Sequence, residues 1–231
     1  AASDVYKRQS IFYEIMEMIR NITQDTTFDA VILADGDFPT NAIPLGILNK
    51  ANYLVCCDGA GAKAIEHGIM PTAVVGDGDS LPKDIKSMLG DKFHYVSEQD
   101  YNDLTKATRY VLATIPTARR IAYIGATGKR EDHTLGNISL MPFYKEEFDI
   151  IPTLVTDYGY FVMAEGKQMF ETSPGQQVSI FNLTCSRLAG NGFKWNVYPY
   201  KMMWQGGLNE AIDNCVSLDG DGMYMVFLNH I

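Results

Sequence analysis

Two closely spaced pairs of aspartates occur in the first half of the chain. Asp77 and Asp79 follow the apolar run 73–75, while Asp100 and Asp103 follow the next apolar run and open a helical pattern. Residues two apart in an extended chain point to the same side, and open α/β sheets bind ligands at the carboxyl ends of their strands. Two such pairs repel each other unless a cation joins them, and these oxygen ligands suit Mg²⁺. Each pair alone is also explained by ordinary turn and helix capping, with Asp100 as the helix cap.

A glycine-containing loop at 125–128 gives a third candidate, again between an apolar run and a helical pattern. Its backbone N–H groups, with Lys129 and Arg130, are suited to hold phosphate oxygens. Asp132 follows at a spacing that lets it orient the Arg130 guanidinium or cap the next helix. A solvated turn explains Lys129 and Arg130 equally well, and a hydrogen-bonded structural role explains His133.

A competing hypothesis comes from the segment that begins at Cys57. Gly59, Gly61 and Ala64 match the pattern G-x-G-x-x-G/A after an apolar run, which is typical of dinucleotide-binding oxidoreductases. Asp58 argues against this function, because its carboxylate would lie beside the pyrophosphate. The pattern also leaves the second pair of aspartates unexplained.

Trp195, one of only two tryptophans, follows an apparent turn at Gly192. A tryptophan in this position is commonly a core or interface residue, but an exposed indole can also stack on a flat or cationic ring. The segment 206–210 is close in sequence, and its Asn209 offers an amide.

The elements that position these residues follow from a regular alternation after residue 28. Apolar runs occur at 30–34, 53–57, 73–75, 93–96 and 120–124. Helical patterns separate them at 60–67, 82–89, 103–114 and 135–144. This alternation predicts a parallel sheet with helices on both faces, because parallel strands are joined by crossover helices. We therefore predict a Rossmann-like α/β domain over residues 28–150.

After about residue 150 the helical periodicity disappears and short strand patterns follow. We expect strands at 153–157, 160–164, 168–171, 177–182, 214–218 and 223–228, with turns at 174–175, 191–192 and 219–220. This pattern predicts an antiparallel β-sandwich over residues 151–231. The chain is thus expected to have an α/β half followed by an all-β half.

Residues 1–27 differ from both halves and are interpreted as an N-terminal extension. The first nine residues have no periodicity and resemble a remnant of cloning or sequence assembly, so they are excluded from the fold argument. Apolar residues then recur at helical spacing from Ile11 to Ile22.

Composition excludes several classes of protein. The chain has 231 residues, of which 46% are hydrophobic and 20% charged, a balance typical of globular proteins. Its net charge of −9 argues against a nucleic-acid or anionic-membrane partner. No apolar run is long enough to cross a bilayer and no secretory signal is evident, which favours the cytoplasm. The four cysteines show no CxxC spacing and are expected to be reduced core residues.

Taken together, residues 28–231 resemble the thiamine pyrophosphokinase family. The matching segments are Cys57-Asp-Gly-Ala60, Gly76-Asp-Gly-Asp-Ser80 after Pro71, Gln99-Asp-x-x-Asp103 with Lys106, Gly125-Ala-Thr-Gly-Lys-Arg-Glu-Asp-His133, and Gly192-Phe-Lys-Trp195. The resemblance implies an N-terminal α/β domain, a C-terminal β-sandwich and a homodimer. It also implies transfer of pyrophosphate from ATP to thiamine with release of AMP.

The resemblance further implies roles for individual residues. Mg²⁺ and the ATP phosphates would be held by Asp77, Asp79, Asp100 and Asp103. The nucleotide would be arranged by Asp58, Lys106, Thr127, Arg130, Asp132 and His133. Thiamine would lie against Trp195, with Asn209 beside it, in a site shared between subunits.

Two positions depart from the family's usual pattern. Gly78 stands where an aromatic residue is usual, and Leu208 stands where a hydroxyl is expected near thiamine. These departures motivate a second hypothesis, in which the protein binds nucleotide or thiamine without turnover. The retained carboxylates and Arg130 favour the enzyme.

Overall fold

The structure contains six parallel strands, of which the alternating pattern predicts five; the sixth follows at residues 151–155. In this computed structural model, which describes residues 18–231, they are β2 (Ala30–Leu33), β3 (Leu54–Cys57), β4 (Ala73–Gly76), β5 (Phe93–Tyr95), β6 (Arg120–Ile124) and β7 (Ile151–Val155). Their order across the sheet is β7-β6-β2-β3-β4-β5, and every neighbouring pair is parallel. The prediction of a mixed α/β fold is confirmed.

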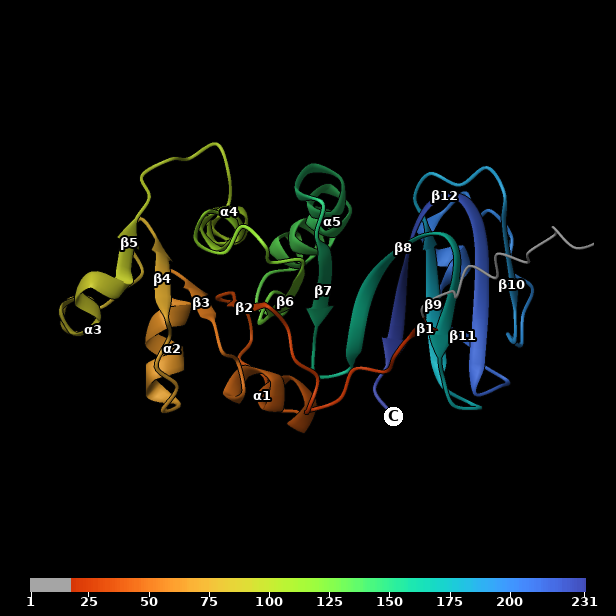
Figure 1. The fold of residues 1–231 in the computed structure, drawn as a ribbon, viewed down its shortest axis with the longest axis horizontal. Coiled ribbons are helices and arrows are strands. Elements are labelled where there is room, and N and C mark those ends of the chain that lie inside the picture. Colours follow the sequence, from red (N-terminus) through yellow and green to blue (C-terminus); the bar gives the residue numbers. More distant parts are fainter. Residues whose placement is uncertain (1–17) are drawn as a thin grey trace, which may run out of the picture.

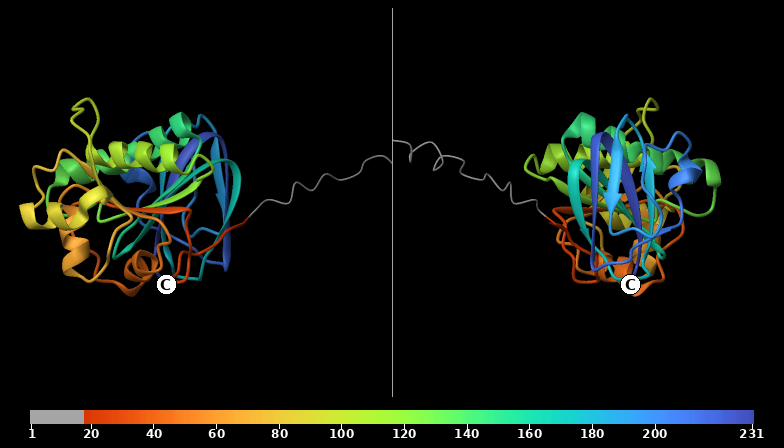
Figure 2. Two further views of the ribbon diagram at one scale, coloured as in Figure 1. Left: turned by 60° about the vertical axis from the view of Figure 1, so that its left-hand side comes forward. Right: turned by 90° about the vertical axis from the view of Figure 1, so that its right-hand side faces the viewer.

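Helices cover both faces of this parallel sheet (Figure 1). On one side lie α1 (Ala42–Asn49) and α2 (Ala60–Glu66), and on the other lie α4 (Asp103–Thr114) and α5 (Glu131–Phe148), while α3 (Lys83–Leu89) and a 3-10 turn (Gly90–Lys92) lie near β5. The turned views of Figure 2 show the same arrangement. Alternate residues of β2 explain it, since Val31 and Leu33 pack in one apolar cluster and Ile32 in the other. Because both faces are covered, every residue of β2 is buried.

Helix α1 was not predicted, because Pro44 and Gly46 weaken the helical pattern. Pro44 is tolerated in the first turn, where its missing N–H has no partner to lose. The helix begins with Asn41, whose Oδ1 accepts a hydrogen bond of 2.9 Å from Ile43 N. Gly46 lets the helix approach Gln24 closely, because a Cβ at this position would lie 2.6 Å from the Gln24 Cβ.

The second half is antiparallel; two of its strands are longer than predicted, and two short ones were not predicted. Its strands are β8 (Gly159–Glu171), β9 (Gln177–Asn182), β10 (Leu188–Asn191), β11 (Asn209–Glu210) and β12 (Cys215–Asn229), with a 3-10 turn at Met203–Gly206. The runs expected as separate strands at 160–164 and 168–171 are one strand, and so are 214–218 and 223–228. The turn predicted at 219–220 was wrong: it lies inside β12, where the register with β8 shifts between Asp219 and Met223. Such a bulge bends a strand without ending it.

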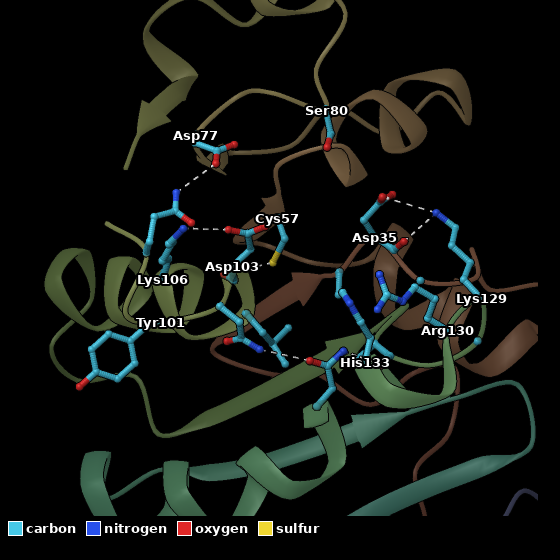
Figure 3. A pocket seen from close by; sticks show the side chains of 18 of the residues that line it. Asp35, Cys57, Asp77, Ser80, Tyr101, Asp103, Lys106, Lys129, Arg130 and His133 are labelled. Atoms are coloured by element: carbon cyan, nitrogen blue, oxygen red, sulfur yellow. Dashed lines mark hydrogen bonds and ion pairs between the residues drawn. The ribbon is translucent and has the colours of Figure 1, made fainter. Parts of the chain in front are cut away.

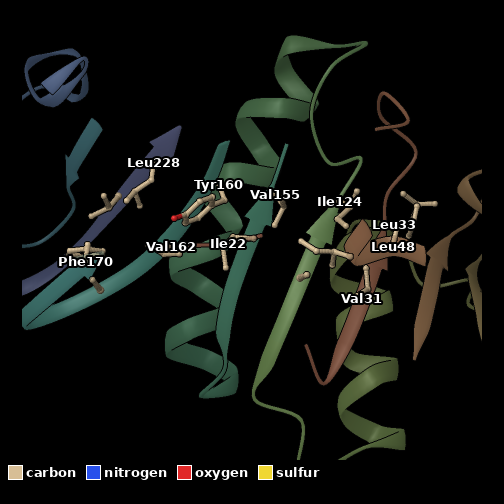
Figure 4. Close-up of a cluster of buried hydrophobic side chains, with 14 of the residues drawn as sticks. Ile22, Val31, Leu33, Leu48, Ile124, Val155, Tyr160, Val162, Phe170 and Leu228 are labelled. Atoms are coloured by element: carbon tan, nitrogen blue, oxygen red, sulfur yellow. The ribbon is translucent and has the colours of Figure 1, made fainter. Parts of the chain in front are cut away.

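Strand β7 joins the two halves. It was expected to belong to the antiparallel sandwich, but it pairs in parallel with β6 and antiparallel with β8. The strands therefore form one continuous sheet. One cluster of buried side chains likewise runs from Val31 and Leu33 across Val155 to Phe170 and Leu228 (Figure 4).

The helical spacing noted for Ile11 to Ile22 lies mostly outside the described residues. Within them, Met18–Ile19 is not helical but forms β1, which pairs in parallel with Met169 and Phe170 of β8. Ile22 is buried in the core. Residues 18–22 therefore belong to the folded unit.

All four cysteines have free thiols, and Cys56, Cys57 and Cys185 are buried while Cys215 is partly buried. The expectation of reduced core residues is confirmed for the first three. Within residues 18–231, none of the helices has the length and apolar character needed to span a bilayer.

Candidate functional site

A cavity of about 620 Å³ lies where the parallel strands end, a volume typical of small-molecule sites. Its lining comes from Cys57 at the end of β3 and from the segments that follow β2, β4, β5 and β6. Strand β2 has β3 on one side and β6 on the other, so the chain reverses its winding direction there. Open α/β sheets bind ligands at such a switch point.

Asp77 lines the cavity from the turn after β4. Its Oδ1 accepts a hydrogen bond of 3.2 Å from Asp79 N, and its Oδ2 accepts one of 3.4 Å from Gln99 Nε2. The N–H of Asp79, followed by the amide of Gln99, lowers the pKa of Asp77, so this partly exposed carboxylate stays charged at neutral pH. The turn depends on Gly78, which has φ +75° and whose Cβ position would lie 2.8 Å from the Phe93 ring.

The segment before α4 brings Asp100 and Asp103 to the same cavity. Asp103 Oδ1 lies 3.2 Å from Lys106 Nζ, one turn along the helix. The prediction that Asp100 caps α4 was wrong. Asn102 is the cap, and its Oδ1 accepts a hydrogen bond of 3.0 Å from Thr105 N. Asp100 is therefore free of a capping role and turned to the cavity.

The four predicted metal ligands are not equivalent. Asp77, Asp100 and Asp103 line the cavity, whereas Asp79 is not among the lining residues. Within residues 18–231, no three Asp, Glu, His or Cys side chains converge closely enough to hold a metal by themselves. Mg²⁺ usually takes only one or two protein carboxylates and completes its shell with water and phosphate. The donor set of carboxylates and the Gln99 amide fits such an ion arriving with a nucleotide.

The loop between β6 and α5 forms the opposite wall (Figure 3). Arg130 and His133 line the cavity, as does Lys129. Arg130 occupies the residue before α5, and its guanidinium donates two hydrogen bonds to Asp132, from Nε at 3.1 Å and from Nη2 at 2.6 Å. This ion pair lowers the pKa of Asp132. Asp132 itself does not line the cavity, so it orients the Arg130 guanidinium from outside the cavity.

Two other residues expected near the nucleotide lie elsewhere. Thr127 lines a smaller cavity of about 150 Å³ on the other side of the same loop. Asp58 is buried beneath the turn after β4, where its Oδ2 accepts 3.0 Å from Ser80 N. Its Oδ1 has no hydrogen-bond partner among residues 18–231. Asp58 thus supports the turn that carries Asp77 rather than lining the cavity.

Asp35 was missed by the sequence analysis. It lines the cavity after β2, and its carboxylate lies 2.7 Å from Lys63 Nζ and 3.4 Å from Lys129 Nζ. Lys129 also donates 2.8 Å to the Asp35 carbonyl, and Figure 3 shows the two side chains turned toward each other. A readable signal existed, because Asp35-Gly-Asp37 after β2 repeats the spacing of Asp77-Gly-Asp79 after β4.

Further lining residues were given no role by the sequence analysis, although Ser80 and Gln99 belong to its motifs. They are Ser80, Gln99, Tyr101, Asn102 and Asn137. Asn137 donates 2.8 Å to the Ala126 carbonyl and so fixes the β6–α5 loop from within α5. Their side chains meet at one cavity because the fold brings the segments after β4, β5 and β6 together.

Trp195 and Asn209 line neither cavity. Their segments belong to the antiparallel half, and β11 with Asn209 lies at the opposite end of the sheet order from β5. The Trp195 residue is 52% exposed, whereas Asn209 is only 4% exposed. The Asn209 amide accepts 3.2 Å from Trp195 N and donates 3.0 Å to Trp195 O.

Trp195 belongs to a set of exposed apolar side chains between residues 195 and 212, called here the 195–212 surface. Its members are Trp195, Tyr198, Met202, Met203, Trp204, Leu208 and Ile212. Exposed apolar residues of this size are candidates for an interaction surface when they lie side by side.

The cavity combines charges that suit a polyphosphate with its cation. Four carboxylates, those of Asp35, Asp77, Asp100 and Asp103, face three cationic side chains, those of Lys106, Lys129 and Arg130. The cations can pair with phosphate oxygens, and the carboxylates can hold a hard metal ion. The site can therefore position a metal–nucleotide complex for phosphoryl transfer.

Two family models match the chain. The thiamin pyrophosphokinase catalytic domain matches residues 46–151. The thiamin pyrophosphokinase substrate-binding domain matches residues 159–227. Between them, the matches include the cavity residues from Cys57 onward and the segment with Trp195 and Asn209.

Known proteins show the same likeness. A thiamine pyrophosphokinase from Bacillus subtilis (strain 168) is 32% identical over 116 residues, which cover 48% of this chain and 52% of that protein. The match thus spans about half the length of this curated relative.

The crystal structure of a thiamin pyrophosphokinase family protein from Enterococcus faecalis has a TM-score of 0.72 at 22% identity and covers 87% of this chain and 99% of its own. The thiamin pyrophosphokinase from Candida albicans has a TM-score of 0.76 at 15% identity and covers 94% of each chain. At these low sequence identities, the two structures show a likeness of fold alone.

Proposed function

The chain belongs to the thiamin pyrophosphokinase family, and from this premise we propose that it transfers pyrophosphate from ATP to the hydroxyethyl group of thiamine, giving thiamine pyrophosphate and AMP. Members of this family are ATP-dependent pyrophosphotransferases. The observation that carries the proposal is the cavity at the switch point of the sheet, which is lined by four carboxylates and three cations. All of these residues except Asp35 lie within the segment that the catalytic-domain model matches.

The two halves of the chain bind different substrates. We assign ATP and Mg²⁺ to a Rossmann-like α/β domain of residues 28–150, and thiamine to an antiparallel β-sandwich of residues 151–231. The change from parallel to antiparallel pairing at β7 supports this division, although β7 itself pairs with both halves.

The nucleotide phosphates are bound between the two walls of the cavity. Arg130 donates to phosphate oxygens while Asp132 holds its guanidinium, and Lys106 and His133 extend the contact from α4 and α5. Thr127 lines the adjoining small cavity and acts through the loop that carries Arg130. Asp58 acts indirectly, because its bond to Ser80 N supports the turn that positions Asp77.

Asp77 and Asp103 are the foremost candidates to hold Mg²⁺, with Asp79 and Asp100 on the same two turns. Mg²⁺ supplies charge neutralisation to the phosphates when it is bound. The hydrogen bond from Asp79 N keeps Asp77 ionised, and the Lys106 ammonium balances part of the charge of Asp103. The carboxylates are thus ready as ligands before the nucleotide arrives.

The reaction joins the hydroxyethyl oxygen of thiamine to the β-phosphorus of ATP. The bond between this phosphorus and the α,β-bridging oxygen breaks, AMP leaves with that oxygen, and the hydroxyl proton passes to a carboxylate of the cavity or to solvent. Alignment of the two substrates and charge stabilisation by Arg130 supply most of the rate enhancement.

Thiamine stacks on Trp195, and the site is completed by a second subunit. Support comes from the exposure of the Trp195 indole and from its absence among the residues that line the cavity of its own chain. A symmetric homodimer buries one copy of the 195–212 surface against its partner and can bring the indole of one chain to the cavity of the other. Asn209 contributes through Trp195, whose backbone it holds.

We propose the cytoplasm as the compartment of the reaction. ATP is abundant there, and the reducing environment is compatible with the four free thiols of the structure.

Formation of AMP and thiamine pyrophosphate from ATP and thiamine, with Mg²⁺ present, tests the proposed function. Product should require both substrates and should form about 100-fold or more slowly in Arg130→Ala. A protein that binds ATP or thiamine but forms no AMP would instead support the non-catalytic alternative. That alternative is motivated by Leu208, which is exposed and has a φ of +63° where the family resemblance predicts a hydroxyl-bearing residue.

A further inference from the structure

Asn209 fixes the backbone of Trp195 while leaving its indole exposed. One end of the Asn209 amide accepts a hydrogen bond of 3.2 Å from Trp195 N, and the other end donates 3.0 Å to Trp195 O. The Asn209 side chain is also the acceptor for Glu210 N, at 2.9 Å. Because the residue is only 4% exposed, these bonds are shielded from competition by water.

The contact extends a short ladder between two segments of the antiparallel half. Ile212 N donates 2.8 Å to Gly192 O, and Lys194 N donates 2.9 Å to Glu210 O. The backbone of Asn209 pairs with Val178 on the other side of β11. Beyond the last backbone bond of the ladder, the side chain of Asn209 bonds both backbone groups of Trp195 and so continues the connection between the two segments.

The position of Asn209 is itself determined by the sheet. It lies in β11, which pairs antiparallel with β9. The backbone N–H of the preceding residue, Leu208, donates a hydrogen bond of 3.1 Å to Ser179 Oγ of β9. The Asn209 side chain is thus fixed by the pairing of β11 with β9, and it fixes the backbone of Trp195 in turn.

We propose that Asn209 is a positioning residue for thiamine: it holds Trp195 ready to stack on the substrate and does not itself bind thiamine. This inference rests on the proposed function, and it replaces the expectation that the Asn209 amide contacts the substrate. The oxygen of the amide already accepts two N–H groups, and its nitrogen donates to Trp195 O. An aromatic group fixed before binding loses less conformational entropy when the ligand arrives.

The first test measures Trp195 without any substrate. In a Trp204→Phe background Trp195 is the only tryptophan, since the chain has two. Asn209→Ala should lower the steady-state fluorescence anisotropy of Trp195 and increase its quenching by acrylamide, because the backbone of this residue is released.

The second test measures turnover in the 231-residue protein. Asn209→Ala should raise the KM for thiamine about tenfold, a factor that corresponds to about 1.4 kcal/mol. The kcat and the KM for ATP should stay within about twofold, because a stacking platform contributes to binding of one substrate.

Gln176→Ala is the matched control. Gln176 is also a buried amide of the antiparallel half, accepting 3.2 Å from Ser173 N and donating 2.7 Å to Asn229 O, with no side-chain bond to Trp195. It should lower stability without changing the Trp195 signal or the KM for thiamine. If Asn209→Ala does not fold, Asn209→Asp replaces it and should shift both readouts in the same direction, because it loses the donor to Trp195 O.

The outcomes separate this proposal from the proposed function. If wild-type protein forms no AMP, the function fails, and the anisotropy measurement alone decides the role of Asn209. If Asn209→Ala matches Gln176→Ala in anisotropy, quenching and thiamine KM, the positioning role is wrong. A raised thiamine KM with unchanged anisotropy and quenching would instead mean that Asn209 contacts thiamine directly.

Discussion

Arg130 and Asp132 form a two-bonded ion pair in which only the arginine lines the cavity. Nε and Nη2 of the guanidinium lie 3.1 and 2.6 Å from the two carboxylate oxygens. Because Asp132 lies in the first turn of α5, the arginine is oriented by the helix that follows it. This geometry presents Arg130 to a phosphate while fixing its plane.

Replacement of Arg130 should therefore affect the chemical step. Arg130→Ala should lower kcat by about 100-fold or more and leave the KM for thiamine within about threefold. Asp132→Asn should cause a smaller loss, because the guanidinium remains but loses its charged partner. Steady-state kinetics with each substrate varied separately would measure both effects, and a large rise in thiamine KM with little loss of kcat would move Arg130 to the other substrate.

The carboxylates after β4 and β5 should be needed for metal-dependent turnover but not for folding. Asp77→Asn keeps an oxygen that can accept the bond from Asp79 N, and Asp100 has no capping role to lose. Each change should reduce kcat by about 100-fold or more. The melting temperature should stay nearly unchanged in Asp100→Asn and should fall slightly in Asp77→Asn, because the bonds that lower the pKa of Asp77 stabilise its charged form in the native protein. Full activity in excess chelator would contradict the metal assignment, and an unfolded variant would favour a structural role.

Lys129 should show separate effects on stability and on nucleotide binding. Its backbone has φ +57°, a left-handed conformation that glycine adopts without a steric penalty. Lys129→Gly and Lys129→Ala both lose the contact with Asp35, but the glycine variant should be about 1 kcal/mol more stable than the alanine variant. Chemical denaturation would measure the difference. Both variants should raise the KM for ATP by a similar factor if the ammonium contacts phosphate, and equal ATP affinity to wild type would limit Lys129 to the Asp35 contact.

A site shared between subunits predicts complementation between two defective proteins. Asp77→Asn lacks a cavity carboxylate and Trp195→Ala lacks the stacking surface, so a mixed dimer contains one site with both wild-type contributions. After unfolding and refolding together, the mixture should be more active at low thiamine than its separately refolded parents combined. If mixed dimers form without this excess, each site is built within one chain.

The buried thiol of Cys56 should make stability depend on alkaline pH. Burial raises its pKa from 9.0 to about 12, so the native state favours the protonated thiol. Its contribution to stability is complete below about pH 9 and is lost as the pH rises toward 12. The free energy of unfolding should therefore fall less steeply over this range in Cys56→Ala than in wild type. Equal slopes would mean that the thiol is solvated in the native protein.

The sequence predicted the parallel strands well, because burial on both faces leaves an uninterrupted apolar run. It did not reveal α1, whose first turn depends on a distant partner: Asp157 accepts bonds from the backbone of Thr40 and Asn41. It also divided β8 and β12 into separate strands, because interruptions such as Gly166 resemble turns when the neighbouring strands are unknown.

The candidate site was predicted where chemistry is concentrated in short motifs, as at Asp77, Asp103 and Arg130. Asp35 was overlooked although its spacing was readable. The different surroundings of Asp77, which lines the cavity, and Asp58, which is buried beneath the same turn, depend on side-chain directions that spacing alone does not determine.

The pairing of β1 has a consequence for how the chain folds during its synthesis. Met18 pairs with Met169, and Asn21 N donates to Glu171 across a separation of 150 residues. The ribosome releases the partner strand only after the whole α/β half has emerged, so β1 can join the sheet only late. Contacts of such high sequence separation slow folding, since a long loop must close before they form. Attachment of β1 is thus expected to be a late step that waits for β8, while the parallel strands assemble earlier around β2.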